Sequence, residues 1–138
     1  MSESEDFSTL KDRAKRKLER DMGPLLLTAL NDPRTVELML NADGRLWQER
    51  LGEKMMCIGT MRVAQAEAII KTVAGYHSKE ITHSKPILEG ELPLDGSRFA
   101  GQLPPVVPFP TFAIRKRAVA IFTLEQYVVA RIMTGTQY

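Results

Sequence analysis

Hydrophobic side chains recur at helical spacing through the first thirty residues of the chain. Between residues 5 and 20 they return every three or four positions, and basic side chains surround this narrow stripe, a pattern typical of a surface helix. Pro24 is well placed near the first turn of a second, more uniformly apolar helix that runs to about Leu30 and ends at the Asn-Asp-Pro run of 31–33. The sequence therefore predicts two N-terminal helices, the second of them in the core.

After these helices, apolar and polar positions alternate over 36–40 and 46–50, on either side of an Asn-Ala-Asp-Gly turn. This pattern predicts a hairpin, and a third short strand is predicted over 55–58. Thr60 is the expected N-cap of the clearest helix in the chain, which should run from Met61 to about His77. Its expected buried stripe consists of Ala66, Ile69, Ile70, Val73 and Tyr76.

Residues 86–117 show no helical period and contain six prolines. They predict a strand, a tight Asp-Gly turn, a second strand, a proline-rich excursion and a last strand at 112–115. A short helix is expected from Thr123, as N-cap, through Met133, and the polar end at 134–138 resembles a linker. The whole pattern predicts an α+β domain: a mainly antiparallel sheet with helices packed on one face, preceded by N-terminal helices.

Composition narrows the class of protein. A length of 138 residues, 43% of them hydrophobic and 26% charged, suits one domain with a real core. The single cysteine, Cys57, excludes internal disulfides and a cysteine metal cluster. No run reaches the roughly 20 apolar residues of a membrane span, and the start lacks the apolar region of a secretory signal, so we expect a cytoplasmic protein. A net charge of +2 does not argue for nucleic acid.

A self-sufficient active site is not visible in the sequence. There is no GxxxxGK[ST] phosphate loop and no GxGxxG motif. His77 and His83 lack a cysteine cluster or HExxH context, which favours structural or solvated roles. Glu89 and Glu91 would share one face of a strand and could imitate a general acid/base pair. A solvated face near a turn is the simpler interpretation, because nothing around them suggests a desolvating pocket.

Arginines at the ends of strands are the remaining candidates for chemistry. Arg98 follows the Asp-Gly turn, and Arg115, Lys116 and Arg117 end the last strand. The planar guanidinium fork suits phosphate, because it donates two parallel charge-assisted hydrogen bonds. Strand alternation places Arg115 and Arg117 on one face and Lys116 on the other. If the strand of Arg98 is a neighbour, two or three guanidinium groups converge on one anion; on spacing alone, ordinary solvated charges remain the simpler interpretation.

Longer motifs resemble the TrbB family of conjugal-transfer ATPases. The most specific are LPLDGSRF and PTFAIRKR, within the run ILEGELPLDGSRFAGQLPPVVPFPTFAIRKRAVAIFTLEQYV. Upstream, DMGPLLLTALNDPRTVELMLNADGRLWQERLGEKM looks like the opening of the same family, and IGTMRVAQAEAIIKTVAG like its first long helix after the hairpin. The resemblance covers the chain from about residue 17 to its end.

That resemblance carries expectations about fold and site. Proteins of the family have a PAS-like amino-terminal domain and a RecA-like domain with the phosphate loop, the Walker B acid and a His box; six subunits form a ring. By motif position, the resemblance implies that Arg98, Arg115 and Arg117 reach the phosphates of ATP, whose Mg ion the second domain mainly binds. Residues 1–133 would be the first domain, with 1–22 as a basic extension and 134–138 as the start of the linker.

The resulting function hypothesis is the N-terminal domain of a conjugal-transfer, type IV secretion motor ATPase. It would contribute ring assembly and arginines at the cleft between domains, with no hydrolysis by itself, because the Walker A and Walker B motifs are missing from these 138 residues. The alternative is a non-enzymatic interaction module that binds or regulates intact ATPase rings or components of the secretion channel. Direct DNA binding is disfavoured, because no aromatic platform is interleaved with the basic residues.

The basic first helix leaves two interpretations open. It could lie on an anionic bilayer, as a peripheral contact with the inner membrane, or on a partner in the secretion channel. It could also be a solvated helix with a short apolar seam packed on the sheet or on a neighbouring subunit. The second is favoured, because Phe7, Leu10 and Leu18 are too few for strong membrane insertion.

Overall fold

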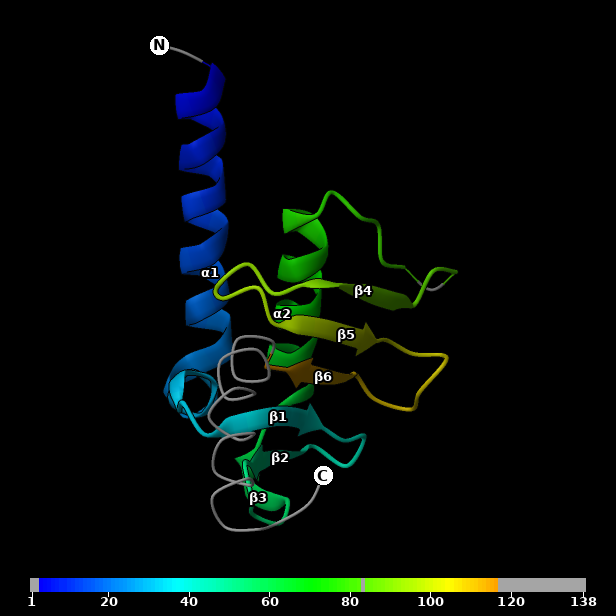
Figure 1. Cartoon of the computed structure of the whole chain (residues 1–138). Coiled ribbons are helices and arrows are strands. Elements are labelled where there is room, and N and C mark those ends of the chain that lie inside the picture. Colours follow the sequence, from blue (N-terminus) through cyan, green and yellow to red (C-terminus); the bar gives the residue numbers. More distant parts are fainter. Residues whose placement is uncertain (1–2, 83, 117–138) are drawn as a thin grey trace, which may run out of the picture.

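The computed structural model describes residues 3–82 and 84–116, and over residues 3–9 it describes the backbone alone. It contains an open six-stranded antiparallel sheet with two helices packed on one of its faces (Figure 1). The α+β class predicted from the sequence is therefore confirmed. In chain order the elements are α1 (Glu3–Asn31), β1 (Thr35–Leu40), β2 (Arg45–Arg50), β3 (Met56–Thr60), α2 (Val63–Tyr76), β4 (Ile87–Glu91), β5 (Arg98–Gln102) and β6 (Thr111–Arg115).

The sheet has the strand order β3-β2-β1-β6-β5-β4. Each half is a local meander of three strands, β1 to β3 and β4 to β6, with α2 between them in the chain. The two halves meet where β1 pairs with β6, in a register that sets Leu38 opposite Ile114. The predicted hairpin, the third strand and the three later strands are all present. Where the prediction gave bounds, at 36–40, 46–50, 55–58 and 112–115, the ends differ by at most two residues.

The core lies between the helices and one face of the sheet. Alternation along each strand sends every second side chain to this face, and Phe99 on β5 stacks there on Phe112 of β6, with ring centroids 5.7 Å apart. The other face, called the open face below, carries the alternate residues. The buried core side chains include Leu18, Met22, Leu26 and Leu30 from α1, Ile69, Ile70 and Val73 from α2, and Leu38, Leu46, Leu88, Phe99, Phe112 and Ile114 from the sheet.

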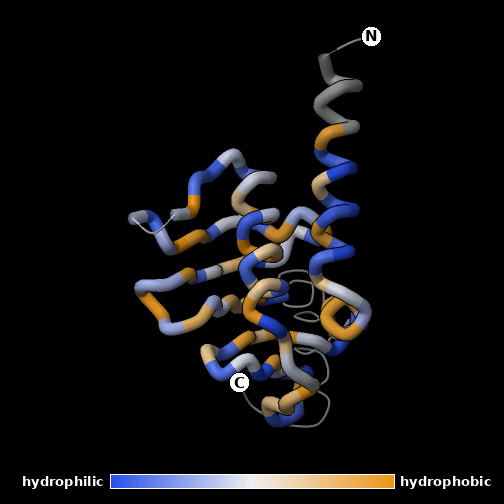
Figure 2. The backbone as a smooth tube through the Cα atoms, turned by 180° about the vertical axis from the view of Figure 1, so that it is seen from behind, coloured by the Kyte–Doolittle hydropathy of each residue, from blue (hydrophilic) through white to orange (hydrophobic). Residues whose placement is uncertain are grey.

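The N-terminal part of α1 extends past α2 and beyond the sheet, and Figure 2 shows that most of this part is hydrophilic. Gly23 breaks the helix, with φ 75° and ψ 171°, and Pro24 follows at once. The sequence predicted two helices here, and the two pieces on either side of Gly23 correspond to them. Because the chain turns at this point, Leu18 and Leu26 both reach the core, although they lie on different pieces.

We predict that Gly23→Ala destabilises the domain by about 1.5 kcal/mol, because positive φ with ψ near 180° is a region that side-chain-bearing residues rarely adopt. Space does not add to this cost, since a Cβ at position 23 would meet its nearest neighbour, Gln65 Nε2, at an ordinary 3.4 Å. Urea denaturation measures the change. Gly75→Ala is the matched control: Gly75 lies within α2 with nothing within 4 Å of a new Cβ, so this change should leave stability equal or raised. Equal effects of the two substitutions would contradict the backbone argument.

Two details of α2 differ from the sequence prediction. Thr60 does not cap the helix, because its backbone belongs to β3, where it is paired with Arg45. The helix begins at Val63 instead, with Arg62 at the N-cap position and no side-chain cap. Of the expected buried stripe, Ala66, Ile69, Ile70 and Val73 are buried, whereas Tyr76 is half-buried and Ala74 takes its place. The predicted helix from Thr123 to Met133 and the linker at 134–138 lie outside the described residues.

Candidate anion-binding site

Arg98 and Arg115 lie next to each other on the open face. Arg98 is the first residue of β5 and Arg115 the last of β6, and the antiparallel register makes them direct partners. Both are exposed. Directly opposite residues hold their Cβ atoms about 5 Å apart, so one anion could contact both guanidinium groups. The strand of Arg98 is thus a neighbour of the strand of Arg115, which is the condition that the sequence set for convergence on one anion. The convergence itself stays a prediction, and Arg117 lies outside the described residues.

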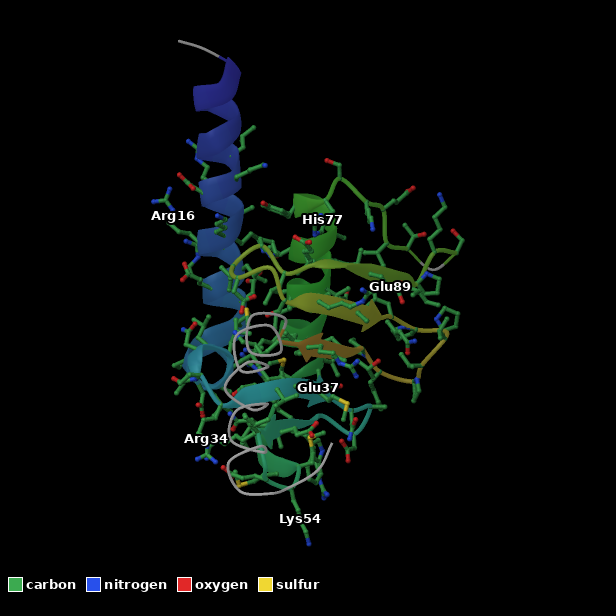
Figure 3. All side chains as sticks on the ribbon, viewed as in Figure 1. Arg16, Arg34, Glu37, Lys54, His77 and Glu89 are labelled. Carbon is green, nitrogen blue, oxygen red and sulfur yellow. The ribbon has the colours of Figure 1, made fainter. Side chains whose placement is uncertain are left out.

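The two arginines belong to a row of five charged residues that crosses five strands of the sheet. Following the register from β4 to β2, the row runs Glu91, Arg98, Arg115, Glu37 and Glu49. Arg115 Nη2 lies 3.4 Å from Glu37 Oε1, which makes this an ion pair. The Glu37 side chain is 17% exposed and that of Arg115 is 71% exposed, so the carboxylate is held against the sheet while the guanidinium remains accessible. Figure 3 labels Glu37 on β1.

This charged row has an electrostatic imbalance at its centre. Like charges placed directly opposite each other on adjacent strands destabilise a sheet, and Arg98 and Arg115 are in that arrangement. The carboxylates of Glu91 on β4 and Glu37 on β1 flank the pair from the two neighbouring strands and offset part of the repulsion. An anion bound between the two arginines would offset it further, and the planar fork of each would donate to phosphate oxygens.

Lys116, the residue after Arg115, joins the two arginine-bearing strands from the core side. Its Nζ donates to Asp95 Oδ2 at 2.5 Å, and the two side chains are 9% and 25% exposed. Asp95 lies in the turn just before β5 and also accepts the backbone N–H of Ser97 at 2.9 Å. Burial raises the pKa of Asp95, but the hydrogen bonds from Lys116 and Ser97 and the charge of Lys116 outweigh it, so its pKa lies below 3.8.

The turn that contains Asp95 is closed by the backbone. Leu92 N–H donates to Ser97 O at 2.7 Å, and Gly96 N–H donates to Leu92 O at 2.9 Å. Gly96 has φ 76°, a left-handed conformation that glycine adopts without strain. Arg98 is therefore the first residue of β5 after a hydrogen-bonded turn. Its backbone position is fixed by the turn on one side and by the strand on the other.

Sequence reasoning missed two parts of this arrangement. Glu37 was predicted as a polar position of the first strand, but nothing local shows that this strand lies beside the one with Arg115. Asp95 was assigned to a turn and Lys116 to the face opposite Arg115, which is where it lies. The signal that could have linked them is a lysine facing an apolar core, since a buried ammonium group requires an acidic partner.

The other chemical candidates do not form a site in the part of the chain that the structure describes. His77 Nε2 lies 2.6 Å from the carbonyl oxygen of Glu91 and donates to it, which ties the end of α2 to β4. Glu89 and Glu91 are both exposed on the open face, in agreement with a solvated strand. His83 lies outside the described residues. The described residues contain no group of three or more potential metal ligands.

The basic helix is only partly packed. Leu18 is fully buried, whereas Leu10, farther along the projecting part, is 61% exposed. Lys17 Nζ donates to Asp21 Oδ2 at 2.9 Å and to Thr72 Oγ1 at 3.0 Å, which fixes the lower part of the helix to α2. Lys11 Nζ lies 5.9 Å from the centre of the Tyr76 ring, above a groove of about 490 Å³ between the helices. Within residues 3–82 and 84–116, no helix is long and apolar enough to span a membrane.

Comparisons with known proteins agree with the fold and the motifs. The conjugal transfer protein TrbB of Rhizobium radiobacter is 46% identical over 125 residues, which are 91% of this chain and 39% of that protein. A probable conjugal transfer protein TrbB of Sinorhizobium fredii (strain NBRC 101917 / NGR234) is also 46% identical over 125 residues, 91% of this chain and 38% of its own length. No protein-family model matches the chain.

A solved structure shares the fold. The VirB11 ATPase from the Brucella suis type IV secretion system, solved in complex with sulphate, matches with a TM-score of 0.74 at 22% identity, over 88% of this chain and 37% of that one. The match falls on the amino-terminal part of VirB11. The chain thus spans about two fifths of the length of the proteins it matches. These findings confirm the resemblance that the motifs indicated, and the chain is a relative of the TrbB conjugal transfer proteins that corresponds to one part of them.

Proposed function

We propose that this chain acts as the N-terminal domain of a conjugal-transfer motor ATPase and that Arg98 and Arg115 contact the phosphates of ATP. One observation carries the proposal: the two guanidinium-bearing residues are direct partners on adjacent strands of an exposed sheet face. Phosphate matches the guanidinium fork, as carboxylate does, and its several charged oxygens would let one group contact two adjacent arginines. Arg117, two residues after Arg115, belongs to the proposal through the family motif.

The arrangement suits a domain that closes over a nucleotide held elsewhere. Phosphoryl transfer needs mainly positioning and stabilisation of charge on the phosphate oxygens, and arginines from a second domain make that stabilisation depend on closure. In this proposal a RecA-like domain binds ATP with its Mg ion and hydrolyses it. This chain supplies the arginines and a contact surface within a ring of six subunits. It does not hydrolyse ATP by itself. ATP then favours the closed state, because the arginines are paired with phosphate only there.

A chimera tests the arginine contacts. In it, this chain replaces the matching 125 residues of the Rhizobium radiobacter TrbB. We predict that Arg98→Ala and Arg115→Ala each lower ATP turnover by the chimera by about 10- to 100-fold, since a hydrogen bond to a charged group contributes about 1.5–3 kcal/mol. Steady-state hydrolysis at saturating and limiting ATP measures the loss. Arg45→Ala is the matched control, because Arg45 is an exposed arginine on the open face at the start of β2, a strand that β1 separates from the strand of Arg115.

The same measurement separates the proposal from its alternative, an interaction module that joins or regulates ATPase rings or binds channel components. The projecting basic part of α1 favours a contact role of that kind, and a peripheral contact with the inner membrane is one form it could take. An interaction module needs no phosphate contact, so normal turnover in both arginine variants, with the chimera assembled as usual, would count against the nucleotide role and favour the alternative.

A further inference from the structure

Glu37 Oε1 lies 3.4 Å from Arg115 Nη2, a nitrogen that would donate to a phosphate oxygen in the proposed function. We propose that Glu37 is an internal competitor for the phosphate: it holds Arg115 in the absence of ligand and has to release it when an anion binds. This inference rests on the proposed function of the arginine pair, and it adds how that site is regulated.

The geometry supports an exchange of partners rather than a permanent pair. Arg115 Nη2 and Glu37 Oε1 are 3.4 Å apart, longer than the roughly 2.7–2.9 Å of a strong charge-assisted hydrogen bond. The Arg115 side chain is 71% exposed, and ion pairs of exposed side chains are weak and screened by salt. Arg115 can therefore move away from Glu37, whereas the largely covered carboxylate stays in place on β1 and loses its cationic partner. This loss opposes the exchange, so a bound anion has to offset it.

Position in the charged row distinguishes Glu37 from the other carboxylates. Glu37 is the direct partner of Arg115 in the β1–β6 register, and Glu49 lies one strand farther, opposite Glu37 itself. Glu91 lies at the other end of the row, opposite Arg98. Glu37 is thus a carboxylate in an ion pair with Arg115, and Glu49 is a matched carboxylate on the same face and in the same row.

A competitor of this kind selects among anions. When a ligand with one negative charge binds, Arg115 only exchanges the Glu37 carboxylate for another single charge, so the gain in binding free energy is small. A ligand with several charged oxygens, such as a di- or triphosphate, can contact Arg98 and Arg115 together and offset the repulsion between them. The site should therefore favour polyphosphate over monovalent anions, and loss of the γ-phosphate should return Arg115 toward Glu37.

Titration of the 138-residue chain with inorganic pyrophosphate tests the inference. Arginine Nε–Hε resonances in ¹⁵N-labelled protein report binding, and variants Glu37→Gln and Glu49→Gln are compared with the parent sequence. We expect Glu37→Gln to tighten pyrophosphate binding about fivefold, the scale of an exposed ion pair, and Glu49→Gln to change it less than twofold. Glu37→Gln should also shift the Arg115 resonance of the free protein, and Glu49→Gln should not. Circular dichroism checks that each variant keeps the fold.

The outcomes separate the inference from the function on which it rests. If pyrophosphate shifts the Arg98 and Arg115 resonances but Glu37→Gln binds no more tightly, Glu37 is not a competitor and the phosphate site remains. Equal gains in the two glutamate variants also overturn the inference, because they show a general effect of negative charge. If neither resonance responds to pyrophosphate in the parent sequence or in Glu37→Gln, the phosphate site itself is wrong.

Discussion

Replacing Phe99 with alanine should lower the free energy of unfolding by about 4 kcal/mol, within the range of about 3–5 kcal/mol for large-to-small changes of buried aromatic residues. The Phe99 side chain is fully buried, and its ring stacks on Phe112 across the β5–β6 pair. Neighbouring side chains can fill the cavity only in part, because they are held by both helices and by the sheet. Phe99 also follows Arg98 directly, so loss of its packing should loosen the start of β5.

Guanidinium chloride denaturation, followed by far-UV circular dichroism, measures this effect. Phe109→Ala is the matched control, since Phe109 is 51% exposed in the proline-rich connection before β6. Its removal should cost less than about 1 kcal/mol, as is usual for surface substitutions. A Phe99→Ala variant as stable as the Phe109→Ala variant would show that the Phe99 ring does not contribute to the core between the sheet and the helices.

Replacing Lys116 with methionine should destabilise the domain by about 3 kcal/mol, the lower end of the cost of breaking a buried ion pair. Methionine fills much of the same space, so the loss comes mainly from Asp95, which remains 75% covered without its ammonium partner and is left with the hydrogen bonds of Ser97. The estimate stays at the lower end, because a quarter of the Asp95 side chain is in contact with water. Lys54→Met, at an exposed lysine between β2 and β3, is the control and should stay within about 0.5 kcal/mol.

The pH dependence of the stability difference between the parent sequence and Lys116→Met provides an independent check. The folded-state pKa of Asp95 lies below the value of 3.8 for the free carboxyl. Its contribution to stability is therefore present above pH 3.8 and is lost as the pH falls through the lower folded-state pKa. The stability gap between the parent sequence and Lys116→Met should be widest near neutral pH and should narrow as the pH falls below 3.8. A gap that is constant over this range would mean that Lys116 acts through packing and not through its charge.

Local patterns in the sequence were sufficient for most of the fold. Alternation with a turn predicted the first hairpin, and the prolines and the Asp-Gly turn predicted the three later strands, because these signals depend on residues close in the chain. Cap positions were less predictable. Thr60 has the side chain of an N-cap, but it is paired in β3, and a tertiary pairing of this kind overrides a local preference.

The site could be predicted in part. Strand alternation correctly placed Arg115 and Lys116 on opposite faces, but whether Arg98 stands beside Arg115 depends on the register between two strands joined by a proline-rich connection. The partnership of Glu37 with Arg115 spans 78 positions, and no periodicity reports a pairing over that distance. The sequence therefore identified the charged residues that could bind phosphate and left undetermined the carboxylate that competes for them.

The meeting of β1 and β6 at the centre of the sheet has a consequence for how the protein folds. Each three-strand meander contains only short connections and can form quickly, whereas the pairing of β1 with β6 must close a loop of more than seventy residues and therefore carries a larger entropic cost. Arg98 and Arg115 lie within one meander, and Glu37 lies in the other. During folding the pairing of Arg98 with Arg115 can therefore form before Glu37 is in place beside Arg115, and the Arg115–Glu37 ion pair forms only when the two meanders join.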